Sequence, residues 1–141
     1  MPRDLTWVAL LIMALVACGP SAPPFSGIDC GSSTQGPGSD YDAVARECVW
    51  NAYSRGAAVR WNVRSYTVEG DPIPETLRFD SVLGVVTTRD MSADKFSNSA
   101  GRRIWTWRCV TMTKMAWVTD PSRYSFKLSN CTGDGTTAVF P

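Results

Sequence analysis

The stretch VRWNVRSYTVEGDPIPETLRFD, Val59–Asp80, carries the clearest structural pattern in the chain. Apolar and polar side chains alternate along VRWNV and again along TLRF, the period of two expected for strands with one buried face. The side chains expected to face the core are Val59, Trp61, Val63, Leu77 and Phe79. The linking EGDPIP has a glycine that can take positive φ and prolines that cannot donate to a sheet, so it predicts a rigid corner. Together these features predict an antiparallel strand pair.

A helix is predicted before this pair, in SDYDAVARECVWNAYSRG, residues 39–56. Ser39 or Asp40 can cap its start, and Gly56 can end it. At helical spacing, one apolar stripe is expected to face the core. Its members are Tyr41, Val44, Ala45, Cys48 and Ala52.

Further strand patterns follow the pair, in Ser81–Asp90, Arg102–Val118 and Arg123–Asn130. The second of these is long enough to contain a bend or a bulge. CTGDGT, Cys131–Thr136, has too few ligands for a calcium site and is expected to be a loose tail. The predicted fold class is therefore α+β, with one N-terminal helix packed on a four- to five-stranded antiparallel sheet. Residues 39–141 are predicted to form this single domain.

The corner also carries a specific resemblance. Thr67–Ile73 reads T-x-E-G-D-P-I, which resembles the core of a small domain family of unknown function in bacterial secreted proteins and lipoproteins. The DKF segment at Asp94–Phe96 and the cysteines Cys109 and Cys131 also match that pattern, so the resemblance covers about Ser39 to Cys131. The resemblance implies the fold and a location outside the cytoplasm. No activity, ligand or catalytic residue is established for the family, so none is implied here.

Residues 1–17 read as a lipoprotein signal peptide. Leu5–Ala17 is uncharged, apolar and of signal-peptide length, and it is shorter than the roughly 20 residues that span a bilayer. LVAC, Leu15–Cys18, resembles the bacterial lipobox, in which small residues permit cleavage before a cysteine whose thiol takes a diacylglyceryl group. A buried core helix, an uncleaved anchor and ordinary secretion are the alternatives. We predict that Cys18 is lipidated.

Residues 18–38 are rich in Gly, Pro and Ser, a composition that predicts a flexible tether. If Cys30 is tied to the domain, only Gly19–Asp29 remains free, and eleven residues span at most about 40 Å. The domain is therefore expected close to its membrane, which is its partner through the lipid on Cys18. The predicted location is the bacterial cell envelope. This means the outer membrane where the organism has two membranes, and otherwise the outer face of the cell membrane.

Five cysteines are present, so lipidation of Cys18 leaves an even number for an exported domain. Three pairings of the four are possible. We favour Cys30–Cys48 and Cys109–Cys131 because each closes a short loop of about 20 residues. The chain has no histidine and its cysteines are widely spaced, which disfavours zinc. No metal or other cofactor is expected.

The net charge of +1 gives no sign of nucleic-acid binding. On the predicted strands, four arginines share the face opposite the core: Arg60, Arg64, Arg78 and Arg108. Such a face could bind an anionic polymer or an acidic protein, and an ordinary solvated face is the alternative. Trp105 and Trp107 fall in phase with Cys109 and are expected in the core instead of on a sugar-stacking surface.

Without histidine, neither a Ser-His nor a Cys-His pair can form, and no residue is predicted to be catalytic. Carboxylates remain: the corner residues Glu69, Gly70 and Asp71 form a possible functional loop, which Glu75 adjoins, and Asp90 and Asp94 lie on another loop. Acidic side chains in turns usually bond to neighbouring amides. We therefore favour a non-catalytic binding or interaction module for an unknown envelope protein or glycan. The alternative is a carboxylate-based hydrolase or metal-binding domain acting on cell-wall material.

Overall fold

The computed structural model describes residues 25–36 and 41–141, which contain one helix and seven strands. In chain order the elements are β1 (Ile28–Thr34), α1 (Ala43–Ser54), β2 (Val59–Tyr66), β3 (Pro72–Asp80), β4 (Gly84–Asp90), β5 (Ile104–Ala116), β6 (Tyr124–Gly133) and β7 (Thr137–Phe140). The strands form one sheet in chain order. β1 pairs with β2 in parallel, and all later neighbours are antiparallel.

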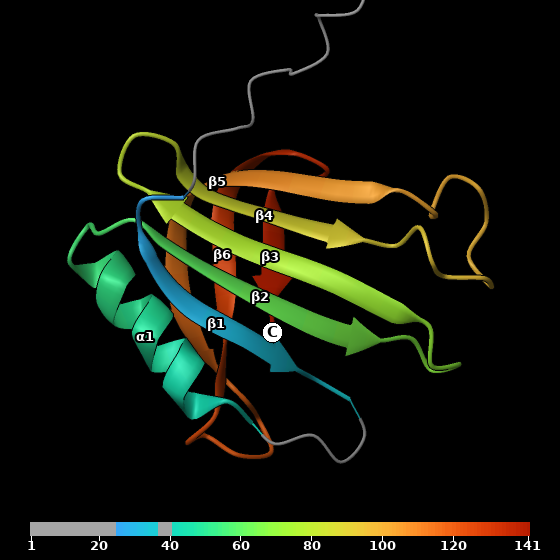
Figure 1. The fold of residues 1–141 in the computed structure, drawn as a ribbon, viewed down its shortest axis with the longest axis horizontal. Coiled ribbons are helices and arrows are strands. Elements are labelled where there is room, and N and C mark those ends of the chain that lie inside the picture. The colour runs from blue at the N-terminus through green and yellow to red at the C-terminus, as the bar shows by residue number, and fades with distance from the viewer. Residues whose placement is uncertain (1–24, 37–40) are drawn as a thin grey trace, which may run out of the picture.

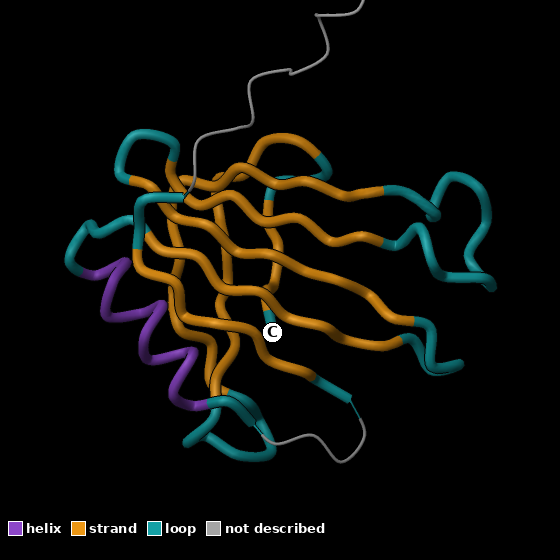
Figure 2. The backbone as a smooth tube through the Cα atoms, viewed as in Figure 1, coloured by secondary structure: helices purple, strands orange, loops and turns teal. Residues whose placement is uncertain are grey.

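The sheet folds over on itself, so that β1–β5 form a front layer and β6 and β7 cross behind it (Figure 1). β5 belongs to both layers, since its first half pairs with β4 and its second half pairs with β6. The core lies between the layers: the Trp61 ring of β2 is 6.4 Å from Phe126 of β6 and 5.4 Å from Phe140 of β7. α1 lies along one side of the two layers (Figure 2).

The predicted fold class is wrong: the sheet has seven strands instead of four or five, and the helix does not cover a sheet face. The apolar faces of the two layers cover each other, so the helix covers only one open side of the core between them. It reaches both layers there, with the Cys30–Cys48 disulfide to β1 and a hydrogen bond from the Met112 amide of β5 to Tyr53 Oη at 3.0 Å.

The predicted helical stripe is also displaced. α1 buries Ala45, Arg46, Val49 and Ala52, whereas Val44 is 83% exposed. The cap is Asp42, whose Oδ1 accepts a hydrogen bond from the Ala45 amide at 2.9 Å. The predicted caps, Ser39 and Asp40, lie outside the described residues.

Two strands lie where the sequence predicts no regular structure. β1 falls inside the predicted tether 18–38, and β7 directly follows the predicted loose tail, whose first residues belong to β6. Of the seven residues of β1 only Ser33 is buried, so backbone pairing with β2 and the Cys30–Cys48 disulfide hold this strand in place. The tail is tied down through Asp134, which accepts a hydrogen bond from the Thr106 amide at 2.6 Å and pairs with Arg103 at 2.6 Å. The predicted signal peptide 1–17 and Cys18 lie outside the described residues.

The strand pair of Val59–Asp80 is confirmed. β2 and β3 are antiparallel, with Trp61 opposite Leu77, and all five predicted core side chains on the pair are buried. The Cys30–Cys48 and Cys109–Cys131 disulfides are also confirmed. The second disulfide joins residues directly opposite each other on β5 and β6. Among the described residues, no helix combines the length and the apolar character needed to cross a membrane.

Candidate functional site

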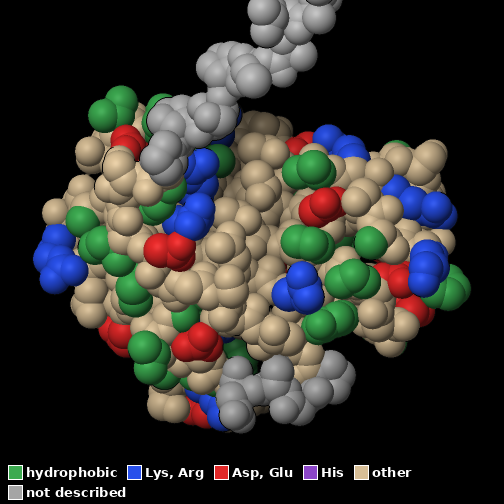
Figure 3. Space-filling model, viewed as in Figure 1, with side chains coloured by type: hydrophobic (Ala, Val, Ile, Leu, Met, Phe, Trp, Pro, Cys, Tyr) green, Lys and Arg blue, Asp and Glu red, His purple; other side chains and the backbone are tan. Residues whose placement is uncertain are grey.

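The four predicted surface arginines lie on the outer side of the front layer. Strand register places Arg60 opposite Arg78, Arg78 opposite Val86, and Val86 opposite Arg108, so three arginines occupy one row across β2–β5. Arg64 lies on the same face of β2, four residues further along the strand. We call Arg60, Arg64, Arg78 and Arg108 the arginine face. Figure 3 views the molecule from this side and shows basic side chains at the surface, with acidic ones among them.

One member of the arginine face is held by β1. The Arg60 guanidinium forms an ion pair with Asp29. The hydrogen bond from Arg60, followed by one from the Gly31 amide, lowers the pKa of the Asp29 carboxyl. The guanidiniums of Arg60 and Arg78 also lie 5.3 and 5.1 Å from the centre of the Phe25 ring. These distances fall within the range of cation–π attraction.

A surface hollow of ≈ 440 Å³ lies at this end of the face, and Phe25, Arg78, Leu83 and Arg108 are among the residues that line it. Beside it, the β3–β4 turn projects into solvent, with Val82 87% and Leu83 65% exposed. The predicted functional residues did not include Phe25 or Leu83. The available signal was an aromatic residue, Phe25, inside a stretch rich in glycine, proline and serine.

The predicted functional loop is a structural corner. Gly70 has φ +90° and donates to the Thr67 carbonyl at 3.0 Å, which closes the turn that the sequence predicts. Asp71 is buried and points toward the segment after β4, where Oδ2 accepts from the Lys95 amide at 3.0 Å and Oδ1 pairs with Lys95 Nζ at 3.1 Å. Glu69 is exposed, so the loop's two carboxylates do not form a common site. The T-x-E-G-D-P-I and DKF segments therefore contact each other.

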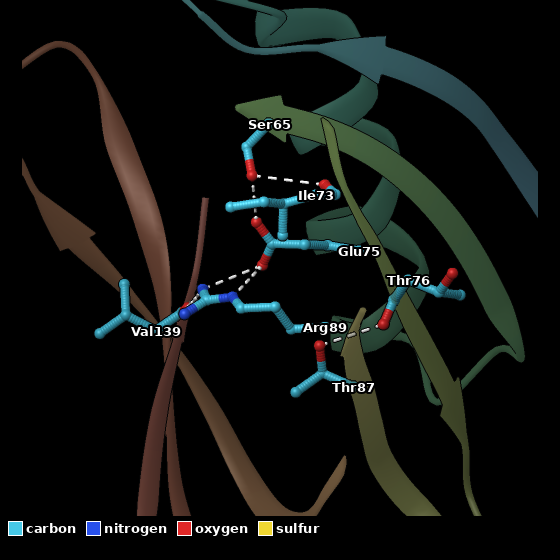
Figure 4. Close-up of polar contacts among 7 residues, drawn as sticks. All are labelled: Ser65, Ile73, Glu75, Thr76, Thr87, Arg89 and Val139. Atoms are coloured by element: carbon cyan, nitrogen blue, oxygen red, sulfur yellow. Dashed lines mark hydrogen bonds and ion pairs between the residues drawn. The ribbon is translucent and has the colours of Figure 1, made fainter. Parts of the chain in front are cut away.

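Glu75 is buried between the layers and is bonded on both sides (Figure 4). One carboxylate oxygen accepts from Ser65 Oγ at 2.8 Å, and the other accepts from Arg89 Nε at 2.9 Å. Arg89 also donates to the Val139 carbonyl of β7 at 3.3 Å. The ion pair joins β3 to β4 within the front layer, and the second bond of Arg89 joins β4 to β7 of the back layer.

The remaining turn carboxylates bond to nearby amides, as predicted. Asp90 accepts from Ser92 at 2.9 Å, and Asp94 accepts from Phe96 and Ser97, both at 3.0 Å. Within residues 25–36 and 41–141, no group of three or more His, Cys, Asp or Glu side chains is arranged to hold a metal ion.

The tryptophan prediction holds for one of the two residues. Trp107 packs against the core, but Trp105 lies outside the buried cluster and stacks on Trp107 with ring centres 6.2 Å apart. The Arg103 guanidinium covers Trp105 at 4.0 Å from the ring centre. A cation–π contact and a ring stack already engage this pair.

Asp71→Asn tests the structural role of the corner. Hydrogen bonds from the Lys95 amide and then the Lys95 side chain lower the pKa of the Asp71 carboxyl in the folded state. A depressed folded pKa gives stability that is present above the unfolded pKa of about 3.9 and is lost as the pH falls through the folded value. We therefore expect Asp71→Asn to lower the melting temperature at pH 7, and the difference from the wild-type protein to shrink as the pH falls below the usual range of an aspartate.

The measurement is a series of thermal unfolding curves from neutral to acid pH. Glu69→Gln is the matched control, because it removes an exposed carboxylate from the same turn. A melting temperature for Asp71→Asn that parallels the wild type at every pH would show that the carboxylate charge of Asp71 does not stabilise the corner.

Comparison with known proteins gives no relative for this fold and surface. No protein-family model matches the chain, and neither a curated protein nor a solved structure matches it. The resemblance carried by Thr67–Ile73 therefore stays a prediction.

Proposed function

We propose that the protein is a lipid-anchored component of the bacterial cell envelope whose folded domain is a non-catalytic binding module. The lipobox-like Leu15–Cys18 segment supports the anchor. The proposed location is the outer membrane in an organism with two membranes, and otherwise the outer face of the cell membrane. Membership of the lipoprotein family with the T-x-E-G-D-P-I core is part of this proposal. It is supported by the bonds that join Asp71 of that segment to Lys95.

The arginine face is the proposed binding surface, and the single observation that carries it is the row of Arg60, Arg78 and Arg108 across neighbouring strands. Guanidinium groups present several donors in a planar fork that suits carboxylate and phosphate oxygens. The hollow beside Arg78 and Arg108 adds the apolar ring of Phe25. An anionic ligand with an apolar portion fits this combination.

The alternative, a carboxylate-based hydrolase or metal-binding domain acting on wall material, has less support. A general acid needs a raised pKa, and a nucleophile or a metal ligand needs accessible oxygens. Asp71 instead has a lowered pKa, and both of its oxygens are bonded to Lys95. Glu75 is buried and bonded to Ser65 and Arg89.

An assay for sugars released from purified cell-wall material separates the two functions. With the full lipidated protein in detergent, we expect no release above the protein-free control, either with calcium or with a chelator. Release that is abolished by Glu75→Gln or Asp71→Asn in a protein that remains folded would overturn the proposal in favour of the hydrolase. A calcium-dependent rise in the melting temperature, lost in Asp71→Asn, would favour the metal-binding domain.

A further inference from the structure

We propose that the arginine face docks onto anionic phospholipid headgroups of the membrane that holds the anchor. In this arrangement the exposed apolar residues Val82 and Leu83, here called the docking tip, enter the interfacial region. Arg78 and Arg108 then contact lipid phosphates. The inference rests on the proposed lipid attachment at Cys18.

The length of the chain ahead of the structure brings this surface to the membrane. Seven residue steps separate Cys18 from Phe25, and even a fully extended chain spans at most about 25 Å over that distance. Phe25 lies against the guanidiniums of Arg60 and Arg78. The end of the arginine face at Arg60 and Arg78 is therefore held near the lipid.

The docking tip lies at the same end of the fold. The β3–β4 turn and the first described residues lie beside each other at the upper left of Figure 1, and Phe25 and Leu83 line one hollow. Apolar side chains flanked by arginines are typical of segments at a membrane interface, because the apolar groups leave water while the guanidiniums stay with the phosphates. Val82 and Leu83, at 87% and 65% exposed, have the character this position requires.

The charge of the surface is complementary to an anionic membrane. Two acidic side chains accompany the four arginines: Asp29, paired with Arg60, and Asp80, which lines the hollow. Asp80 also accepts hydrogen bonds from the amides of Val82 and Leu83, so it shapes the docking tip. Four positive and two negative charges leave an excess of two positive charges. A short connection to the membrane makes a weak attraction sufficient, since it keeps the local concentration of headgroups high.

Chemical modification of arginine measures this contact directly. The lipidated protein is reconstituted in vesicles of phosphatidylcholine alone, or of phosphatidylcholine with about 30% phosphatidylglycerol, treated with phenylglyoxal and analysed residue by residue by mass spectrometry. We expect labelling of Arg78 and Arg108 to fall about fivefold in the anionic vesicles, a protection of the size that one basic residue contributes at an anionic surface. Raising the salt from about 0.1 M to about 1 M should restore labelling, because the screening length falls to about 3 Å.

Two internal comparisons sharpen the test. Arg123, in the turn between β5 and β6, should label equally in both kinds of vesicle. The double variant Val82→Ser, Leu83→Ser should lose most of the protection of Arg78 and Arg108. Its matched control is Val118→Ser, which changes a valine that is 99% exposed in that other turn. The control should retain the protection.

Each contrary outcome has one interpretation. Equal labelling in both kinds of vesicle, with the protein floating with each, would overturn docking and leave the lipid anchor intact. Failure to float with either would overturn the anchor and this inference with it. Protection in neutral vesicles that appears only after an anionic wall polymer is added would assign the arginine face to that polymer and overturn membrane docking.

Discussion

Cys18→Ser is expected to abolish lipidation and with it stable membrane attachment. Serine oxygen cannot replace the thiol in diacylglyceryl transfer, so the variant should keep its signal peptide or lose tight membrane association. The lost binding energy is large, because each buried CH₂ of an acyl chain contributes about 0.8 kcal/mol and two or more chains give lasting attachment. The intact mass of the purified protein and its flotation with vesicles after a high-salt wash measure the two effects.

The matched control is the double variant Cys30→Ser, Cys48→Ser. It removes two thiols and the disulfide between β1 and α1 but leaves Cys18 in place, so its lipid mass should be unchanged. If Cys18→Ser retained the lipid mass and required detergent for extraction, the lipobox interpretation of Leu15–Cys18 would be wrong. The envelope location would then need another basis.

The correct predictions from sequence follow from strong local patterns. Val59, Trp61 and Val63 alternate with polar residues, and this pattern fixes both the strand and the face it buries. The same alternation places Arg60 and Arg64 on the open face, so the arginine face could be predicted without tertiary information. The disulfides were predictable for a related reason, since each bridge joins segments that are close in the chain.

The missed strand β1 has no comparable pattern. Its sequence, IDCGSST, is polar, buries only Ser33, and is interrupted by an irregularity in its pairing with β2 between Asp29 and Ser32. Composition therefore favoured a tether. Because β1 pairs with β2 in parallel across α1, the contacts of Asp29 and Phe25 with the arginine face depend on tertiary structure.

Arg46 shows why the helical stripe was displaced. Arginine is almost never fully buried without partners, so the sequence favours a surface position for it. In the structure Arg46 is 0% exposed, with Nε donating to the Tyr124 carbonyl at 3.1 Å and Nη1 to the Asp42 carbonyl at 3.2 Å. Its guanidinium lies 4.2 Å from the Tyr41 ring centre. These partners come from two parts of the chain, Tyr41 and Asp42 just before the helix and Tyr124 in β6, and the periodicity of the helix does not encode them.

Trp61→Ala is expected to cause the largest loss of stability among single substitutions on β2. The side chain is fully buried between the layers, where it contacts Phe126 and Phe140. Truncating a buried tryptophan to alanine lowers the free energy of unfolding by about 4 kcal/mol, through lost burial and the cavity that remains. In a domain of this size, such a loss lowers the melting temperature by more than about 15 °C.

Trp61 also connects β1 and the start of α1 to the core. Its Nε1 donates to Ser33 Oγ at 2.8 Å, and Ser33 Oγ donates to Asp42 Oδ2 at 2.5 Å. Asp42 in turn caps α1. Trp61→Phe keeps an aromatic ring in the core but removes the Nε1 donor and part of the buried ring system, so it should cost less than Trp61→Ala and more than the roughly 1–2 kcal/mol of one buried hydrogen bond. Denaturant unfolding of both variants measures the two losses. A loss below about 1 kcal/mol for Trp61→Ala would contradict a core closed between the layers, because the cavity would then have collapsed or never formed.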